Sequence, residues 1–315
     1  MSKILILTEA GKNIGFGHLT RCSAIQNYLE YNSYDVDLIV NLNETVISNL
    51  DFENNDWLNI NPGFFANKYD IIIIDSYLVT ESWLLGLKNK RTIVVNIDDY
   101  NRIIYPVDLI INPNVFAESL DYSNQITKCI GGPNYLILRK SFRSKKVKYT
   151  YNGKPRLLIT LGGSDYRNLI PKLIKWSTDL NLYKISIIAP EGAEILSEET
   201  RVLSLLDAES MAYEIINTDV IISACGQTLN EIAVINRSTI GIGIDIDQIP
   251  NHKYYNSINF IKHNLWWDQK NLEEKVKNEL IRLVDFSNRE SELKRAFKLN
   301  KDGIKNVINE IIKLL

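Results

Sequence analysis

The chain has 315 residues, of which 45% are hydrophobic, and its formal net charge is −2. This length suits two domains better than one, and the near-neutral charge offers no basic field for nucleic acid. Its three cysteines lack metal-ligand spacing and argue against a disulfide scaffold. No apolar run approaches the length of a membrane span, and the first residues enter a strand rather than a signal peptide. We therefore expect a cytoplasmic protein that is not inserted in a membrane.

The first predicted strand, Ile4–Leu7, leads into a turn that holds a histidine. The turn reads Gly15-Phe16-Gly17-His18 and continues into a helical pattern that begins Leu19-Thr20-Arg21-Cys22. Glycine lets the backbone turn sharply and approach a ligand closely, and a helix start offers free N–H groups. Because the chain has only three histidines, His18 is a candidate acid–base residue. The structural alternative is that it merely steadies the turn.

Buried strands alternate with helices along the whole chain. Runs of Ile and Val that do not alternate with polar residues are typical of strands covered on both faces, and hence of a parallel sheet. The predicted strands are Ile4–Leu7, Val36–Val40, Ile71–Ile74, Thr92–Ile97, Leu109–Ile111, Arg156–Leu161, Lys184–Ala189, Val220–Ser223 and Thr239–Ile244. The predicted helices include Asn168–Leu180, Met211–Asn217, Thr228–Ile235 and most of the tail from Leu272 to Leu315. The pattern predicts the α/β fold class.

A polar, basic stretch without periodicity, 142–155, separates two halves of similar size. We place a Rossmann-like domain at 1–145, a linker at 146–155 and a second Rossmann-like domain at 156–315, whose last helix is able to pack back on the first domain. Two such domains joined once are expected to face a cleft. Ligands of open parallel sheets bind beyond the carboxyl ends of the strands, so the loops after strands are the candidate sites.

Four loops of the first half carry polar groups at predicted strand ends. They are the turn with Gly17, His18 and Arg21, then Asp75-Ser76-Tyr77, Asp98-Asp99-Tyr100-Asn101 and Asn112-Pro113-Asn114. A cluster of His, Asp and Tyr at one sheet edge can perform acid–base chemistry. The structural alternatives are that Asp98 and Asp99 cap turns or helices, and that Tyr77 is a core aromatic with its hydroxyl at the rim.

Two glycine-containing turns follow predicted strands of the second half. They are Gly162-Gly163-Ser164-Asp165 and Ala224-Cys225-Gly226-Gln227-Thr228, and the helix after the second turn bears Glu231. Glycine turns at helix starts can cradle a pyrophosphate, and a glutamate one turn into a helix can reach a ribose diol. One such turn is more often a backbone requirement, but two in one domain favour a nucleotide. The sequence has no P-loop, no nucleophile elbow and no dinucleotide fingerprint.

Taken in order, these loops resemble the UDP-2,4-diacetamido-2,4,6-trideoxy-β-L-altropyranose hydrolase family of pseudaminic acid biosynthesis, and the related spore-coat polysaccharide proteins. The matching segments span most of the chain, at 15–22, 75–77, 97–102, 108–114, 131–142, 161–168 and 223–231. The resemblance implies the GT-B architecture. This chain departs from the family pattern in the second half, at Cys225-Gly226, Asn230 and Asp245-Ile246-Asp247-Gln248, where the family more often has Gly-Gly, a large aromatic and an Asn-Gln pair.

The resemblance also implies a mechanism, in which His18 activates water with Tyr77 and Asp75 as catalytic partners. On the first domain, the residues expected to bind substrate are Gly17, Arg21, Asp98 and Asn114. On the second domain, they are Gly162, Gly163, Ser164, Gly226, Gln227, Thr228, Glu231, Asp247 and Gln248. UDP leaves a 2,4-diacetamido-2,4,6-trideoxyhexose, and neither metal nor cofactor is needed because helix N-termini meet the phosphate charge. The expected partner is the UDP-sugar, bound by a monomer or a weak homo-oligomer.

Two alternatives stay open. A glycosyltransferase on the same fold would use an acceptor hydroxyl in place of water, with His18 still the base. The first domain shows no clear basic and apolar patch for a membrane-bound acceptor, although Trp57, Phe64 and Phe65 could form an apolar lip. The other alternative is a non-catalytic protein that binds a nucleotide sugar, and the presence of both His18 and Tyr77 speaks against it.

Overall fold

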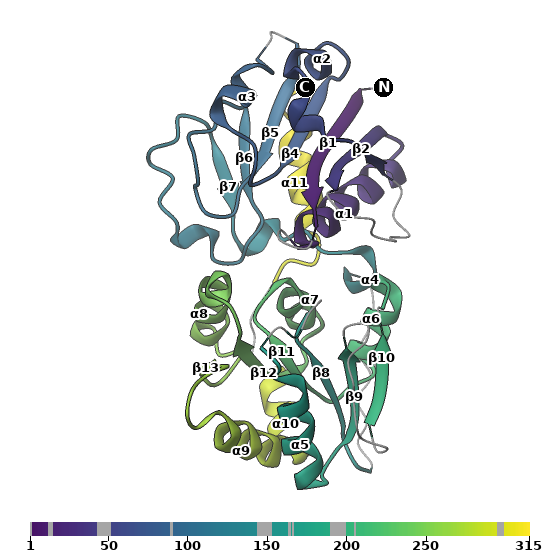
Figure 1. Ribbon diagram of the computed structural model, residues 1–315, viewed down its shortest axis with the longest axis vertical. Helices are drawn as coiled ribbons and strands as arrows, with labels where there is room; N and C mark the ends of the chain where they lie inside the picture. The colour runs from purple at the N-terminus through teal and green to yellow at the C-terminus, as the bar shows by residue number, and fades with distance from the viewer. Residues whose placement is uncertain are drawn as a thin grey trace. The chain divides into compact units, whose positions relative to one another are not determined.

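The computed structural model describes residues 2–11, 15–42, 52–88, 91–143, 153–162, 165, 167–189, 200–204, 206–294 and 299–315. The chain divides into two compact units (Figure 1). Unit 1 consists of Met1–Lys140 and Asn300–Leu315, and unit 2 consists of Ser141–Leu299. Within the described residues, each unit holds one parallel sheet with helices packed on it, which confirms the predicted α/β class.

Unit 1 is built on a seven-stranded sheet of order β3-β2-β1-β4-β5-β6-β7. The strands are β1 (Lys3–Ala10), β2 (Asp35–Leu42), β3 (Glu53–Asn54), β4 (Ile71–Asp75), β5 (Ile93–Ile97), β6 (Leu109–Asn112) and β7 (Cys129–Gly131). The helices are α1 (Gly17–Tyr31), α2 (Pro62–Ala66), α3 (Glu81–Leu85) and α11 (Gly303–Ile312), with short 3-10 turns η1 (Trp57–Asn59), η2 (Ala117–Ser119) and η3 (Pro133–Tyr135). Helix α4 (Lys140–Arg143) lies at the boundary between the units.

Alternate residues of the central strands face two different cores, as the period of a strand requires. Ile4 and Ile6 of β1 pack with α1 and α11 on one face of the sheet. Leu5 and Leu7 pack with Trp57, Phe65 and the neighbouring short helices on the other face. Both faces are apolar and covered, which explains the unbroken Ile and Val runs of the sequence.

The apolar lip expected from three aromatic residues is not formed. Trp57 and Phe65 are 0% and 1% exposed and belong to the core of unit 1, so that only Phe64, at 57%, reaches the surface. The indole N–H of Trp57 donates a hydrogen bond of 2.7 Å to the carbonyl oxygen of Thr8 in β1. These aromatic side chains therefore anchor the short helices to the sheet.

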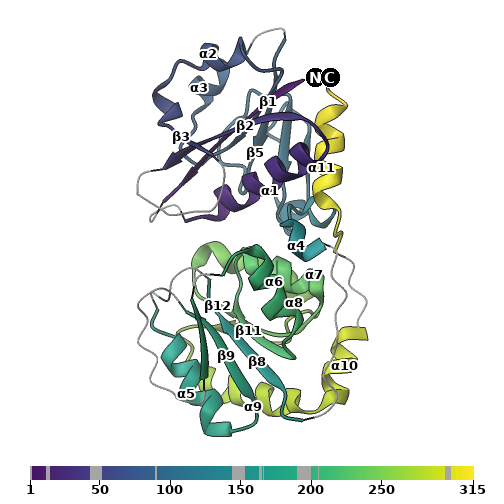
Figure 2. The ribbon, with the colours of Figure 1, turned by 90° about the vertical axis from the view of Figure 1, so that its right-hand side faces the viewer.

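The last helix of the chain, α11, completes unit 1 (Figure 2). Its residues Ile304, Val307, Ile308 and Ile311 are buried in the same core as α1. The helix begins at a close approach to η3, because a Cβ atom added to Gly303 would lie 2.3 Å from the carbonyl oxygen of Leu136. The C-terminal segment is thus part of the body that carries the N-terminal strands.

Unit 2 is built on a six-stranded sheet of order β10-β9-β8-β11-β12-β13. The strands are β8 (Arg156–Thr160), β9 (Lys184–Ala189), β10 (Thr200–Ser204), β11 (Val220–Ala224), β12 (Ser238–Gly243) and β13 (Leu265–Trp266). The helices are α5 (Ile170–Leu180), α6 (Ala208–Ile216), α7 (Gln227–Ile235), α8 (Ile249–Ser257), α9 (Leu272–Val284) and α10 (Phe286–Lys294), with a 3-10 turn η4 (Ile246–Gln248). Helices α5 and α9 share one core with the central strands.

The four strands that were not predicted from the sequence, β3, β7, β10 and β13, all lie at sheet edges. An edge strand is covered less than a central one, so its sequence does not need a long apolar run. The polar stretch expected from residue 142 begins inside a helix, since Phe142 lies in α4 and is 1% exposed. Residues 144–152 lie outside the described part of the chain.

Candidate active site

Unit 1 has a topological switch point between β1 and β4. Strand β1 pairs with β2 on one side and with β4 on the other, so the connections that leave these strands diverge. Open parallel sheets bind ligands at the carboxyl ends of strands at such a point. Helix α1 starts at Gly17, soon after β1, and β4 ends with Asp75, which brings the predicted residues His18 and Asp75 together.

His18 and Asp75 form a buried pair. The Nδ1 atom of His18 lies 2.7 Å from Oδ1 of Asp75, and the two side chains are 6% and 0% exposed. Burial by itself lowers the pKa of His18, but the Asp75 carboxylate and its hydrogen bond raise it more, so the net pKa lies above the ordinary histidine value. With Nδ1–H donating to Asp75, the neutral ring keeps its lone pair on Nε2, which is the form that accepts a proton.

Arg21 links Asp75 to a second carboxylate, that of Asp99. Its Nε and Nη2 atoms donate hydrogen bonds of 2.5 Å to the two oxygens of Asp75. Its Nη1 and Nη2 atoms donate to the oxygens of Asp99 at 2.7 and 3.0 Å. Burial opposes ionisation of Asp75, yet Arg21 and His18 hold its pKa far below the usual range. Both carboxylates are thus ionised at neutral pH, since the pKa of Asp99 is lowered too, against burial and mainly by Arg21.

Tyr77 covers His18 and reaches the same network. Its ring meets the imidazole edge-on, with centroids 4.4 Å apart and an interplanar angle of 89°. Its hydroxyl donates a hydrogen bond of 2.5 Å to Oδ2 of Asp99. Burial and the Asp99 carboxylate raise the pKa of Tyr77 far above its ordinary value, so the phenol stays protonated. Tyr77 is 39% exposed, so it is not the core aromatic residue that the structural alternative expected.

Asp98 and Asp99 are adjacent in sequence but have different surroundings. The Asp98 carboxylate accepts hydrogen bonds from the hydroxyls of Tyr105 and Tyr122, both at 2.5 Å, and from the backbone N–H of Asn101 at 2.6 Å. These contacts tie together the long segment after β5. Asp99, which was not among the expected site residues, is the one that contacts Arg21 and Tyr77.

The asparagines after β6 support Asp99. The side-chain amide of Asn114 donates a hydrogen bond of 2.6 Å to Oδ1 of Asp99, and that of Asn112 donates to the Asp99 carbonyl oxygen at 3.1 Å. Asn112 Oδ1 accepts from the backbone N–H of Asn114 at 3.0 Å. The predicted residue Asn114 is therefore brought to the network, together with Asn112, which sequence reasoning left without a role.

The glycine turn before α1 leaves space at the start of that helix. Gly15 has a positive φ of 81° and pairs with Gly11 in a short bridge. Gly17 is exposed, and a Cβ atom added there would meet nothing within 4 Å. Phe16 caps α1 without a side-chain hydrogen bond. The backbone N–H groups of the first turn are thus not capped by that side chain.

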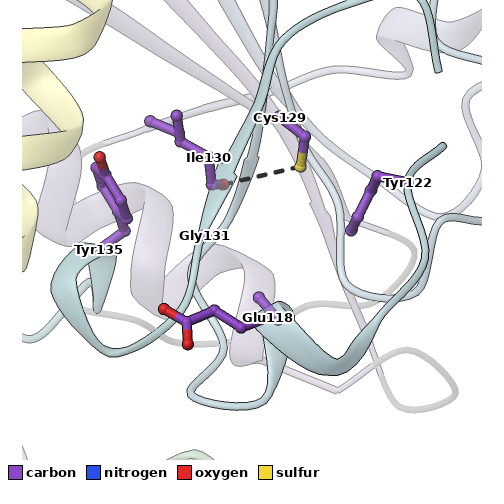
Figure 3. A pocket seen from close by; sticks show the side chains of 7 residues that line it. Glu118, Tyr122, Cys129, Ile130, Gly131 and Tyr135 are labelled. Carbon is purple, nitrogen blue, oxygen red and sulfur yellow. Dashed lines mark hydrogen bonds between the residues drawn. The ribbon is translucent and has the colours of Figure 1, made fainter.

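A pocket of about 370 Å³ lies beside β7 and the segment after β6 (Figure 3). Its lining residues are Ala117, Glu118, Tyr122, Cys129, Ile130, Gly131 and Tyr135. Tyr122 connects it to the network, because its hydroxyl accepts from Asn112 Nδ2 at 3.0 Å and donates to Asp98. Burial raises the pKa of Cys129 to about 12, so its thiol is a neutral, weakly polar part of the wall.

Unit 2 has its own switch point, between β8 and β11. Strand β8 pairs with β9 on one side and with β11 on the other, and both predicted glycine turns follow these strands. Gly162 has a positive φ of 93°, and the Asp165 carboxylate accepts hydrogen bonds from Leu169 N and Ile170 N at the start of α5. The expected residues Gly163 and Ser164 lie outside the described part of the chain.

The second turn places Gly226 at the N-cap of α7, without a side-chain cap. Gln248 supports it from η4, since its Oε1 atom accepts from the backbone N–H of Cys225 at 3.1 Å and of Ile244 at 3.2 Å. Gln227 is exposed and Thr228 half-buried in the first turn of α7. An exposed, glycine-capped helix start is the local geometry that binds anions.

Glu231 and Asp247 differ in burial. Glu231 lies in α7 and is 7% exposed. Asp247 is exposed in η4, where the surrounding protein and then the neighbouring Asp245 carboxylate raise its pKa. Asn230, one of the departures from the family pattern, donates to Gln227 Oε1 at 2.9 Å and accepts from the Tyr255 hydroxyl at 2.7 Å. Its side chain is thus engaged inside unit 2.

The other two histidines lie in unit 2 in different settings. His252 is 2% exposed, and burial lowers its pKa. His263 is 40% exposed at its side chain and lies 3.2 Å from Glu279. Within the described residues, no group of three or more His, Cys, Asp or Glu side chains is arranged to hold a metal ion. None of the described helices is long and apolar enough to cross a bilayer.

Comparison with known proteins places the two units in a known architecture. Solved structures that align over 99% of both chains include MurG of Acinetobacter baumannii, with a TM-score of 0.65 and 15% identity, and the spinosyn forosaminyltransferase SpnP, with a TM-score of 0.63 and 13% identity. A Staphylococcus aureus MnaA–UDP complex aligns over 100% of this chain and 97% of the other with a TM-score of 0.60 and 10% identity. The protein therefore has the GT-B fold, as its resemblance to the hydrolase family implied.

Two curated relatives match the chain at low sequence identity. The chain is 24% identical over 268 residues, 82% of its length, to a Helicobacter pylori protein named pseudaminic acid cytidylyltransferase and UDP-2,4-diacetamido-2,4,6-trideoxy-β-L-altropyranose hydrolase. It is 26% identical over 263 residues, 73% of its length, to an uncharacterized protein of Methanocaldococcus jannaschii. The chain spans about half the length of these relatives, 48% and 53% respectively. No protein-family profile matches the chain.

Proposed function

We propose that the protein hydrolyses a UDP-sugar, with water activated by His18 in unit 1 and the nucleotide bound by the glycine turns of unit 2. The buried His18–Asp75 pair at the switch point of β1 and β4 carries this proposal. The likeness of the chain to the Helicobacter pylori protein, whose name includes a UDP-sugar hydrolase activity, supports a 2,4-diacetamido-2,4,6-trideoxyhexose as the sugar. The reaction would belong to the synthesis of a pseudaminic-type acid or a surface polysaccharide.

The chemistry needs one general base and one good leaving group. Nε2 of neutral His18 takes a proton from water while the water oxygen attacks the anomeric carbon. The glycosyl C–O bond breaks, and UDP leaves with the bonding electron pair. The Asp75 carboxylate stabilises the imidazolium that forms, and the proton then passes to solvent.

The remaining residues of unit 1 have distinct proposed roles. Tyr77 is exposed beside His18 and places the water or the sugar. Gly17 leaves room for the sugar at the start of α1. Arg21 and Asn114 donate hydrogen bonds to Asp99, so they affect the substrate indirectly, by holding that carboxylate in place. Asp98 holds the segment after β5 in place.

In unit 2, we propose that the nucleotide is bound by the glycine turn after β8 and by the start of α7. The phosphates would be bound by Gly162, Gly163, Ser164, Gly226, Gln227 and Thr228. Glu231 would accept hydrogen bonds from the ribose diol, Gln248 would hold the turn that precedes α7, and Asp247 would face the sugar or solvent. Helix N-termini stabilise the negative charge that develops on departing UDP. We further propose that the protein works in the cytoplasm as a monomer or weak homo-oligomer.

The second candidate is a glycosyltransferase, in which an acceptor hydroxyl takes the place of water. Structural neighbours named as transferases, such as SpnP, share the fold over 99% of the chain, which supports this alternative. His18 would be the base in both reactions. The two differ in whether UDP is released when no acceptor is present.

The test is incubation of the pure protein with a panel of UDP- and CMP-sugars, with and without sugar acceptors, while nucleotide release is followed. We expect release from a UDP-diacetamido-trideoxyhexose without acceptor, with ¹⁸O from labelled water incorporated in the sugar rather than in UDP. His18→Gln should lose at least about a hundredfold in turnover. His263→Gln, which changes a half-exposed histidine of unit 2, is the matched control. If UDP is released only when an acceptor is present, the reaction is glycosyl transfer rather than hydrolysis. If His18→Gln keeps full activity, His18 is not the general base.

A further inference from the structure

Glu9, at the carboxyl end of β1, is a buried carboxylate that the proposed reaction does not use. Its side chain is 0% exposed. Its Oε1 atom accepts a hydrogen bond of 2.7 Å from the backbone N–H of Tyr77, and its Oε2 atom accepts one from the hydroxyl of Ser76. Because β1 and β4 are neighbouring strands, Glu9 reaches across the switch point and holds the two residues that follow Asp75.

The loop that Glu9 holds is closed by other hydrogen bonds. The hydroxyl oxygen of Ser76 accepts from the backbone N–H groups of Leu78 and Val79 at 3.0 and 3.2 Å. From the segment after β5, Nη2 of Arg102 donates to the carbonyl oxygens of Ser76 and Val79 at 3.3 and 3.0 Å. Glu9 therefore holds this loop from β1.

The fixed backbone determines where the Tyr77 side chain lies. That side chain is 39% exposed, so packing alone constrains it only in part. Two of its contacts belong to the candidate site: the imidazole of His18, at a centroid distance of 4.4 Å, and the Asp99 carboxylate, at 2.5 Å. Its ring centroid also lies 6.4 Å from that of Tyr100. A shift of the backbone N–H of Tyr77 would change both contacts together.

The chemistry of Glu9 points to more than a structural role. Among the described residues, both of its hydrogen-bond donors are neutral groups, a hydroxyl and an amide. A buried carboxylate without a charged partner is costly to desolvate, and an apolar side chain fills such a position at lower cost. We propose that Glu9 is a positioning residue of the candidate active site, which sets Tyr77 against His18 and affects turnover more than substrate binding. This inference rests on the proposed function.

The first test compares two substitutions. Glu9→Ala removes both acceptors, whereas Glu9→Gln keeps an acceptor for the N–H of Tyr77 and nearly the same volume. We expect Glu9→Ala to lower kcat on the order of tenfold to a hundredfold while KM changes by less than about threefold. Glu9→Gln should recover most of the loss. A wild-type kcat for folded Glu9→Ala, or a loss confined to KM, would overturn the proposal.

A double-mutant cycle then asks whether Glu9 acts through Tyr77. In a Tyr77→Ala background, Glu9→Ala should have little further effect on kcat, because the residue it positions is gone. Independent, multiplying losses would show that Glu9 does not act through Tyr77. If Glu9→Ala does not fold, Ser76→Ala takes its place in the cycle, since it removes the hydroxyl that donates to Glu9, together with the acceptor of the Leu78 and Val79 N–H groups.

A measurement without substrate separates failure of this inference from failure of the proposed function. With labelled aromatic rings, the unmodified protein and Glu9→Gln should show a nuclear Overhauser contact between His18 and Tyr77, and Glu9→Ala or Ser76→Ala should weaken it. The contact is expected because the ring centroids lie 4.4 Å apart. If no UDP-sugar is hydrolysed yet this contact depends on Glu9, the hydrolase assignment falls and the positioning role stands. An equally strong contact in every variant would overturn the positioning role.

Discussion

The Nε and Nη2 atoms of Arg21 donate hydrogen bonds of 2.5 Å to the two oxygens of Asp75, and both side chains are buried. The same guanidinium binds Asp99, so that one cation bridges the two carboxylates that His18 and Tyr77 contact. A planar guanidinium suits this task, because its donors are arranged in a rigid fork that matches two carboxylates. His18 and Tyr77 are therefore positioned by one internal ion network.

Loss of the guanidinium should destabilise unit 1. Arg21→Met keeps much of the side-chain volume but removes the hydrogen bonds that Arg21 makes to Asp75 and Asp99, both buried. Removing one partner of a buried ion pair typically costs about 3–5 kcal/mol of unfolding free energy. Urea denaturation at pH 7 measures this.

The control for that substitution is Lys175→Met. Lys175 pairs with Asp179 at 2.9 Å, but the two side chains are 73% and 42% exposed. An exposed pair contributes at most about 1 kcal/mol. A loss from Arg21→Met as small as the loss from Lys175→Met would contradict the structural role of Arg21.

The pH dependence of activity should follow His18. Because Asp75 outweighs burial and raises the pKa of His18, kcat/KM should rise with pH through an apparent pKa above the ordinary histidine value of about 6.5. Asp75→Asn removes the main cause of the rise, so the titration midpoint of His18, followed by NMR, should move to lower pH. Asp179→Asn, which changes an exposed carboxylate, should leave it in place. A midpoint that does not respond to Asp75→Asn would argue against the pairing.

The same shift has a consequence for stability. A group whose pKa is higher in the folded state stabilises the fold while it is protonated. The contribution of His18 is thus fully present below about pH 6.5, its unfolded pKa, and is lost as the pH rises through the folded pKa. The difference in unfolding free energy between the unmodified protein and His18→Gln should therefore shrink as the pH is raised. A difference that grows with pH would have the wrong sign.

The position of these residues at the carboxyl ends of the strands is better predicted from the sequence than the contacts that they make. All nine central strands expected from apolar runs are present, because burial on both faces leaves a continuous Ile and Val pattern. In a parallel sheet, the loops after those strands lie at one edge. His18, Asp75 and Tyr77 therefore come together as the resemblance implied.

What could not be predicted depends on side-chain direction in irregular segments. Asp98 and Asp99 follow β5 as neighbours, and a turn decides that Asp99 points to Arg21 while Asp98 binds two tyrosine hydroxyls. Glu9 lies in a strand whose other residues are mostly apolar, and its partners come from 67 and 68 residues away in the chain. Such pairings depend on strand order, which a single sequence does not specify.

Nucleotide affinity should depend on Glu231. Glu231→Gln keeps the size of the side chain but replaces a carboxylate that we propose accepts hydrogen bonds from the ribose diol. Hydrogen bonds to charged groups contribute about 1.5–3 kcal/mol, so UDP affinity should fall about tenfold or more in calorimetry. Glu209→Gln, at an exposed position of α6, is the control. Equal UDP affinity in a folded Glu231→Gln protein would remove this residue from the nucleotide site.

The stability of unit 1 should depend on Gly303, the first residue of α11. A Cβ atom at position 303 would lie 2.3 Å from the oxygen and 2.5 Å from the nitrogen of Leu136, and backbone atoms cannot move aside as a flexible side chain can. Gly303→Ala should therefore cost about 1–3 kcal/mol through overpacking, although alanine favours helices over glycine by about 1 kcal/mol. Lys305→Ala, at an exposed position of the same helix, should change stability by no more than about 0.5 kcal/mol. Thermal denaturation compares the two. If Gly303→Ala were as stable as Lys305→Ala, the close approach of α11 to η3 would not contribute to holding together the unit that carries His18.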